Sequence, residues 1–255
     1  MTQTLLLVDL GNSRLKWAWS DGDGLQVGEP VDHSRPLAEP LATAWARPPR
    51  VTRVLVASVA RPRLEAELAQ AIRAHVGVEP EFVSSRSEAC GVRVAYARPE
   101  KLGVDRFLAL IALHAQAREP VVLASVGTAL VLDALAADGR HLGGLIAPSP
   151  LLMQEALLGA TARVSASTAA RIVEVAVDTE DAVRSGCWLA AAALIERFHG
   201  QSAHALGATP ALALAGGAAG EIAPLVRIAS RLEPDLVLRG LAVVAGETPL
   251  SSAGP

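Results

Sequence analysis

TLLLVDLGNSRLKWAWS, at residues 4–20, is the stretch that decides the fold. It contains an apolar run at 4–9, a Gly11-Asn12 turn and a second apolar run at 15–20. Short apolar runs on either side of a glycine turn are typical of neighbouring strands. We therefore expect this part of the chain to open a β-sheet with a strand–turn–strand.

A similar pattern returns near the middle of the chain. The sequence LASVGTA at 123–129 aligns without a gap with LVDLGNS at 7–13. A repeated strand–turn–strand indicates two similar domains facing each other across a cleft. Two unrelated glycine turns after apolar strands would give the same match, so both interpretations stay open.

The remaining segments alternate between strand and helix patterns, which predicts an α/β fold. Further strands are expected at 25–31, 51–59, 80–83, 121–126, 129–135, 141–147, 211–215 and 236–238. Helices are expected at 62–75, 103–117, 151–158, 181–199, 221–230 and 241–244. The second set of strands begins after residues 118–120, so we expect domains at 1–118 and 119–255.

The composition argues against several classes of function. The net charge of the 255 residues is −3 and there is no block of Lys or Arg, so broad attraction to nucleic acid or an anionic membrane is not expected. Cys90 and Cys187 form no C-x-x-C pair, and the histidines show no metal-ligand spacing. The apolar run at 5–8 is too short for a signal peptide and no run is long enough to span a membrane, so we expect a cytoplasmic protein.

The first turn carries polar groups that suit phosphate. Gly11 leaves backbone N–H groups exposed, Asn12 and Ser13 add neutral donors, and Lys16 adds a positive charge. Asp9, at the end of a buried strand, would hold Mg²⁺, usually through water. An ordinary β-hairpin with Asn and Ser satisfying the turn is the alternative.

The second turn would present similar groups. It consists of Ser125, Gly127, Thr128 and Ala129, with Asp133 further along the same strand. Two such turns would clamp the β- and γ-phosphates of a nucleotide, because catalysis of phosphoryl transfer depends on positioning and charge stabilisation. The alternative is again a plain hairpin, with Asp133 as a surface charge.

Two further segments are candidates for chemistry. Asp105, in the first turn of the helix expected at 103–117, would accept a proton from a substrate hydroxyl, and Arg106 would bind the substrate or the moving phosphoryl charge. Favourable interaction of Asp105 with the helix dipole is the simpler explanation. Gly216 and Gly217 permit close backbone approach, as a nucleotide base or ribose would need.

Together these motifs resemble those of the type III pantothenate kinases, a family of the actin, sugar-kinase and heat-shock ATPase superfamily. The resemblance extends from Leu6 to about Leu241. The motifs are Asp9-x-Gly11-Asn12-Ser13-x-x-Lys16, Tyr96-x-x-Pro99-x-x-Leu102-Gly103-x-Asp105-Arg106, Gly127-Thr128-Ala129 with Asp133, Gly143-Gly144-x-Ile146-x-Pro148, Asp178-Thr179-x-x-Ala182-x-x-x-Gly186 and Gly216-Gly217-Ala218. The second of these is the most specific.

The resemblance implies two actin-like (ribonuclease H-like) domains, an ATP site in the interdomain cleft, Mg²⁺ near Asp9 and a homodimer. It implies ATP-dependent phosphorylation of pantothenate to 4'-phosphopantothenate, the first step of coenzyme A biosynthesis, with Asp105 as general base. The pantothenate pocket would include Tyr96, Gly103, Val104, Asp105, Arg106 and Thr179, the last from either the same subunit or its partner. The ATP site would include Asp9, Gly11, Asn12, Ser13, Arg14, Leu15, Lys16, Gly127, Thr128, Ala129, Gly216 and Gly217.

Ser125 departs from the family pattern. Relatives usually have Asp there, and in the family that carboxylate is associated with a monovalent cation, K⁺ or NH₄⁺. A neutral hydroxyl should bind the cation more weakly, so dependence on it is in question. Two alternative functions remain: another sugar or small-molecule kinase of the superfamily, and a non-catalytic nucleotide-binding regulator of the same fold.

Overall fold

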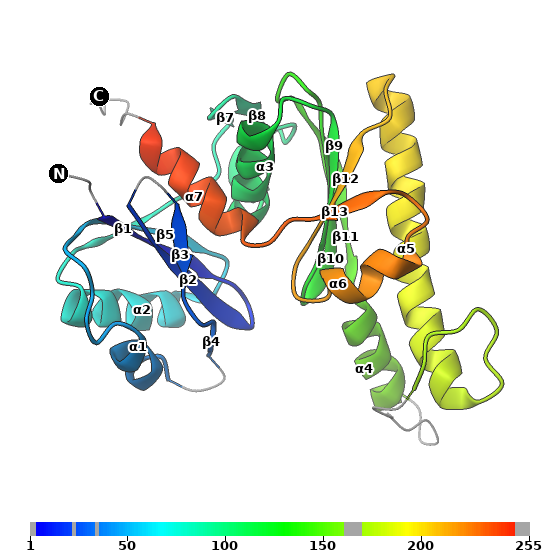
Figure 1. Ribbon diagram of the computed structural model, residues 1–255, viewed down its shortest axis with the longest axis horizontal. Helices are drawn as coiled ribbons and strands as arrows, with labels where there is room; N and C mark the ends of the chain where they lie inside the picture. Colours follow the sequence, from blue (N-terminus) through cyan, green and yellow to red (C-terminus); the bar gives the residue numbers. More distant parts are fainter. Residues whose placement is uncertain (1–3, 22–23, 34–35, 161–169, 248–255) are drawn as a thin grey trace. The chain divides into compact units, whose positions relative to one another are not determined.

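The computed structural model describes residues 4–21, 24–33, 36–160 and 170–247. The chain forms two compact units, drawn together in Figure 1. Unit 1 combines Met1–Ala117 with Asp235–Pro255, and unit 2 is Arg118–Pro234. Unit 1 is therefore built from two separate stretches of the sequence.

The sheet of unit 1 starts from the strand pair at residues 4–20. The central strand β1 pairs antiparallel with β2 and parallel with β5, and the order is β3-β2-β1-β5-β6, with β4 also on β2. The strands are β1 (Thr4–Leu10), β2 (Arg14–Ser20), β3 (Leu25–Val27), β4 (Val31–Asp32), β5 (Val51–Ser58) and β6 (Pro80–Phe82). The run expected at 25–31 divides into β3 and β4 around Gly28 and Pro30, because proline cannot donate to a ladder.

Alternate residues of β1 face two hydrophobic layers. Leu6 and Val8 pack in the cluster formed with α1 (Ala38–Ala44) and α2 (Pro62–His75). Leu7 packs in the opposite cluster, formed with α3 (Val104–Gln116) and α7 (Leu236–Gly246). The period-two alternation of strand side chains therefore places helices on both faces of this sheet (Figure 1).

The link from β6 to α3 contains short elements that the sequence did not predict. A hairpin joins β7 (Glu88–Ala89) to β8 (Val92–Arg93), with Cys90 and Gly91 at positive φ in its turn. A 3₁₀ helix, η1 (Pro99–Lys101), then leads to Gly103 and α3. This link places Tyr96 near the start of α3.

The last helix, α7, corrects two expectations. Residues 236–238 were expected to be a strand and 241–244 a separate helix, but one helix spans both. The helix also belongs to unit 1, so the second unit does not extend to residue 255 as expected. A side chain at Gly240 would collide with the backbone of Leu108, so glycine lets α7 approach α3 at backbone distance.

Unit 2 has a similar strand arrangement. Its central strand β9 pairs antiparallel with β10 and parallel with β12, in the order β11-β10-β9-β12-β13. The strands are β9 (Val121–Val126), β10 (Ala129–Leu135), β11 (His141–Pro148), β12 (Ala211–Ala215) and β13 (Ser230–Leu232). The repeat of the strand–turn–strand is thus accompanied by a repeat of the surrounding sheet order.

The main helix of unit 2, α5 (Thr179–Leu206), covers one face of this sheet (Figure 1). Trp188 and Ile195 of α5 pack against the buried residues of β9, β10 and β12. The helix is longer than the expected 181–199 and ends at Gly207, which has a φ of +66°. A second helix, α4 (Pro150–Ala160), packs beside α5.

The helix expected at 221–230 is wrong. Only α6 (Ala219–Ile222) and the 3₁₀ helix η2 (Ala223–Leu225) form there, and the chain then becomes β13. Pro224 lacks a backbone N–H and so cannot continue a helical ladder. Across the described parts of the chain, we find no helix with the length and apolarity needed to cross a membrane.

Candidate active site

The first turn of unit 1 closes between β1 and β2. The N–H of Gly11 donates to the carbonyl oxygen of Arg14 at 3.1 Å, and His33 Nε2 lies 2.9 Å from the carbonyl oxygen of Gly11. Asn12 and Ser13 are exposed at the tip. Leu15 is buried in the core, so only its backbone is available to a ligand. The turn thus presents polar residues at its tip, while hydrogen bonds hold Gly11 and Arg14 in place at its base.

Asp9 and Lys16 lie opposite each other in the β1–β2 ladder. Burial, followed by the charge of Asp105, raises the pKa of Asp9 to about 7, while Lys16 lowers it and Asp235 raises it further. These influences place three carboxylates and one ammonium near one another, all within unit 1. The first turn therefore adjoins a concentrated set of charges.

Asp105 and Arg106 occupy the first turn of α3. Asp105 Oδ1 accepts a hydrogen bond of 2.8 Å from the backbone N–H of Arg106. A side chain at Gly103 would come within 2.5 Å of that oxygen, so glycine leaves room for the carboxylate. The side chain of Val104 packs in the core that α3 shares with α7, so only the backbone of Val104 is available to a ligand. Asp105 is thus held at the start of the helix as expected.

Arg106 is buried, with 7% of its surface exposed. Its Nη1 donates to the hydroxyl oxygen of Tyr96 at 3.1 Å, and its guanidinium lies 5.8 Å from the centre of the Tyr96 ring. The contact with the aromatic ring fixes the orientation of the buried guanidinium. The structure therefore brings together Tyr96, Gly103, Asp105 and Arg106.

The second turn lies in unit 2, between β9 and β10. The N–H of Gly127 donates to the carbonyl oxygen of Ala129 at 2.9 Å, and Gly127 and Thr128 are exposed. Gly216, at a φ of +88°, is so close to the backbone of Val126 that a side chain there would collide with it. Gly216 and Gly217 therefore lie beside the second turn, while Ser125 sits half-buried at the end of β9.

Asp133 does not contribute to the second turn, and it is not a surface charge either. It is fully buried, and Asp133 Oδ1 lies 2.9 Å from Nε2 of His141, on the neighbouring strand β11. No spacing pattern in the sequence indicated that His141, in β11, would be the partner of Asp133. Asp133 thus has a structural role in the sheet of unit 2.

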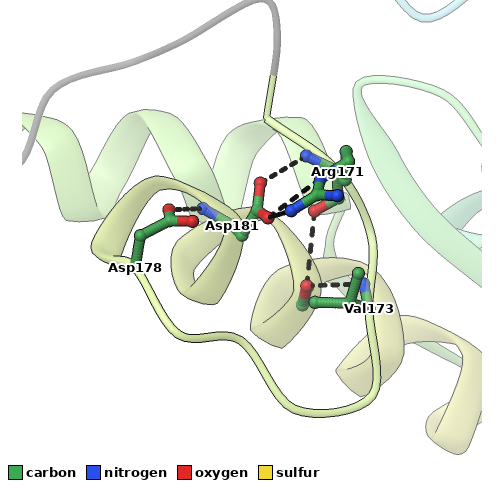
Figure 2. Close-up of polar contacts among 5 residues, drawn as sticks. Arg171, Val173, Asp178 and Asp181 are labelled. Carbon is green, nitrogen blue, oxygen red and sulfur yellow. Dashed lines mark hydrogen bonds and ion pairs between the residues drawn. The ribbon is translucent and has the colours of Figure 1, made fainter.

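Thr179 begins α5, beside a cluster of hydrogen bonds that fastens the preceding segment to the helix (Figure 2). Asp178 Oδ1 accepts from the N–H of Asp181 at 2.9 Å, and Asp181 accepts from the N–H of Arg171 at 2.6 Å and from its guanidinium at 3.0 Å. Ser185 Oγ accepts from the N–H of Val173 at 2.9 Å. The bonds made by Asp181, the one from the backbone of Arg171 foremost, lower the pKa of its carboxyl group.

A groove of about 930 Å³ runs between α4 and α5. It is mostly apolar and is lined by Pro148, Leu152, Met153, Ala156, Leu157, Ala176, Val177, Asp178, Thr179, Ala182, Val183, Gly186 and Cys187. Pro148 pairs with Ala129 in the sheet, which connects the groove to the second turn. Val177 is 95% exposed at its rim, although valine is usually buried.

Two residues that contact the first turn were not indicated by any sequence motif. His33 and Asp235 stand in segments that the motifs do not include, and Asp235 is 219 positions from Lys16, its partner. Among the described residues, no group of three or more His, Cys, Asp and Glu side chains has a metal-binding arrangement. The first turn, Tyr96 and residues 103–106 thus share unit 1, and the second turn, Gly216, Gly217 and Thr179 share unit 2.

Comparison with known proteins identifies the family. Residues 5–201 match the family model described as type III pantothenate kinase. A type III pantothenate kinase of Nitrosococcus oceani is 39% identical over 256 residues, covering 96% of this chain and 94% of the relative.

Solved structures share the fold. A Campylobacter jejuni protein described as a Baf family transcriptional activator superposes with a TM-score of 0.60 at 19% identity, covering 94% of this chain and 96% of that one. MreB 5 of Spiroplasma citri, solved with AMPPNP, gives 0.51 at 10% identity, with 95% and 96% covered. The expected actin-like α/β fold and the expected family are both confirmed. The chain belongs to the type III pantothenate kinase family.

Proposed function

We propose that this protein transfers the γ-phosphoryl group of ATP to pantothenate, giving 4'-phosphopantothenate for coenzyme A biosynthesis. The family match over most of the chain supports the reaction. One observation supports the location of the chemistry: Asp105 is close enough for its charge to raise the pKa of Asp9, which lies opposite Lys16 in the β1–β2 ladder. The neighbour of Asp105, Arg106, is held by Tyr96. A base, a cation and an anion-binding guanidinium therefore share one region.

The proposed roles follow from the chemistry of each group. Asp105 accepts the proton of the pantothenate hydroxyl as that oxygen bonds to the γ-phosphorus and the bond to the ADP oxygen breaks. Arg106 pairs with the pantothenate carboxylate, with Tyr96 fixing the guanidinium plane. The N–H of Gly11 is used in closing the first turn, so Lys16 and the polar groups of the exposed residues Asn12 and Ser13 bind phosphate oxygens.

Unit 2 supplies the remaining proposed ATP contacts. The exposed tip of the second turn, at Gly127 and Thr128, would lie against the phosphate oxygens from the side of unit 2. Gly216 and Gly217, exposed beside them, offer a backbone surface with little steric hindrance to the base or ribose.

Asp9 has the chemistry that Mg²⁺ requires. It provides carboxylate oxygens, and the nearby charges of Asp105 and Asp235 favour a cation there. Bound with ATP, Mg²⁺ would neutralise charge on the phosphates. Ser125 offers only a hydroxyl, so we propose that K⁺ or NH₄⁺ is bound weakly if at all. Ser125→Asp should then create a dependence on K⁺ that the unsubstituted enzyme lacks.

We also propose a homodimer through the groove between α4 and α5. The groove includes exposed apolar side chains, Leu152, Leu157 and Val177, which a second copy would cover. Thr179 at the groove would then lie at the interface, where it can serve the pantothenate pocket of either subunit. Leu157→Arg should give a monomer in sedimentation velocity, whereas Phe82→Arg, at an exposed apolar residue of unit 1, should not.

A direct assay tests the function. Purified protein, ATP, Mg²⁺ and pantothenate should give ADP and 4'-phosphopantothenate in equal amounts. Phosphorylation of a sugar but not of pantothenate would instead identify another kinase of the superfamily. Nucleotide binding without transfer to any acceptor would favour a regulator. The free thiols of Cys90 and Cys187 and the need for ATP support a cytoplasmic location.

A further inference from the structure

Lys16 forms an ion pair with Asp235, and the distance from Lys16 Nζ to Asp235 Oδ1 is 3.3 Å. The side chains are 37% and 25% exposed, respectively, so neither is a freely solvated surface charge. A lysine ammonium has three donors. One donor directed to Asp235 leaves two for phosphate oxygens at the first turn.

Asp235 breaks two rules of local structure. It has a φ of +53°, in the left-handed region that costs a non-glycine residue conformational energy. It also stands at the N-cap of α7, where aspartate normally accepts a hydrogen bond from the helix backbone. No such bond occurs there within the described residues, and the carboxylate instead contacts Lys16. Residues that break local rules tend to do so for a functional reason.

The position of Asp235 is fixed by the packing of α7. Gly240, one turn further along, brings α7 to backbone distance from Leu108 of α3. Leu238 and Leu241 of α7 are buried in the core beneath the sheet. Because α3 also carries Asp105, this packing sets Asp235 relative to both the proposed base and the first turn.

We propose that Asp235 is a positioning residue for the reaction: it holds the ammonium of Lys16 at the first turn, ready to bind nucleotide phosphate. This role rests on the proposed function, since it assumes that the first turn binds phosphates. Holding the long lysine side chain before the nucleotide arrives reduces the entropy lost on binding.

A simple charge effect predicts the opposite sign. If Asp235 were only a negative neighbour, its removal would reduce repulsion of the phosphates and tighten nucleotide binding. A positioning role predicts weaker binding on removal of the carboxylate, and only while Lys16 is present. The direction of the change therefore separates the two.

The experiment measures binding of a fluorescent ATP analogue with Mg²⁺ to the full chain. Asp235→Asn suits the left-handed backbone and keeps the side-chain shape, and we expect it to weaken binding roughly three- to tenfold. In a Lys16→Met background the same substitution should change affinity less than twofold, because coupled residues are not additive. Glu79→Gln, which breaks an exposed ion pair with Arg73, is the matched control and should bind as the unsubstituted protein does.

Asp235→Gly separates binding from stability. Glycine relieves the left-handed backbone, so this variant should unfold at the same or a higher temperature while still binding nucleotide more weakly. Unchanged or tighter binding by Asp235→Asn, or an equal effect with and without Lys16, would overturn the positioning role alone. Absence of nucleotide binding by the unsubstituted protein would overturn the proposed function as well.

Discussion

His33 Nε2 donates a hydrogen bond of 2.9 Å to the carbonyl oxygen of Gly11. His33 directly follows β4, which pairs with the start of β2 at Arg14. The first turn is consequently fixed both by its own closing bond and by a side chain outside the hairpin. A turn fixed before ligand binding loses less entropy when phosphate oxygens dock on its N–H groups.

His33→Ala should weaken ATP binding about fivefold, because the carbonyl of Gly11 loses a bond worth about 1 kcal/mol. His33→Gln, which keeps a side-chain N–H donor, should recover part of the loss. Titration with ATP and Mg²⁺ measures both. The control is His75→Ala, at the end of α2. Equal affinity of the alanine variant and the unsubstituted protein would remove His33 from the support of the turn.

Asp105→Asn should lower kcat for pantothenate phosphorylation by a factor of about 10² to 10⁴, because the amide cannot accept the hydroxyl proton. ATP should still bind, since the substitution keeps size and shape, with only a modest loss of affinity because a negative charge near the Mg²⁺ position at Asp9 is removed. Glu100→Gln, in the nearby η1, serves as the control. A variant that retains full turnover would show that another group takes the proton.

Asp9→Asn should make the protein without ligand more stable at pH 8, on the order of 2 kcal/mol, while weakening Mg²⁺-dependent ATP binding. The pKa of Asp9 is raised to about 7, so between about pH 4 and 7 the folded state keeps a proton that the unfolded state has lost. Stability from this group is present at low pH and disappears as the pH rises through 7.

Thermal unfolding at a series of pH values tests whether the stability from Asp9 decreases as the pH rises. The difference between Asp9→Asn and the unsubstituted protein should be greatest near pH 8 and shrink towards pH 5. Asp138→Asn, at an exposed carboxylate of unit 2, should show no such trend. A difference that grows on acidification would contradict the raised pKa.

Asp181→Asn should release the segment from Arg171 to Asp178 from α5 (Figure 2). Because the pKa of Asp181 is lowered, its contribution to stability is present above the ordinary aspartate range and is lost as the pH falls through the lower folded-state value. The variant should therefore lose less stability on acidification than the unsubstituted protein. Limited proteolysis at neutral pH should cut this segment faster in Asp181→Asn than in Glu180→Gln, its neighbour on the helix.

The parts of the site that the sequence predicts are local. Gly11 and Gly127 follow apolar runs, and each turn forms between the strands that those runs predict. Asp105 and Arg106 lie in the first turn of the predicted helix, a placement that helical spacing is sufficient to give. In each case the relevant residues are close in sequence, so short-range patterns contain the necessary information.

The parts that escaped prediction depend on distant contacts. The pairing of Lys16 with Asp235 spans 219 positions, and it requires α7 to return to unit 1. The start of α7 was mistaken for a strand because a short apolar run does not distinguish the two. Asp133 was grouped with the second turn, or else taken as a surface charge, because only the packed sheet brings it to His141.

The discontinuity of unit 1 imposes an order on biosynthesis. Unit 2 is one uninterrupted stretch, so it can acquire its native packing while the ribosome is still adding α7. The face of the N-terminal sheet that contains Leu7 and Leu55 must wait for Leu238 and Leu241. The half of the protein made first is therefore completed last, when α7 joins α3 on that face of the sheet.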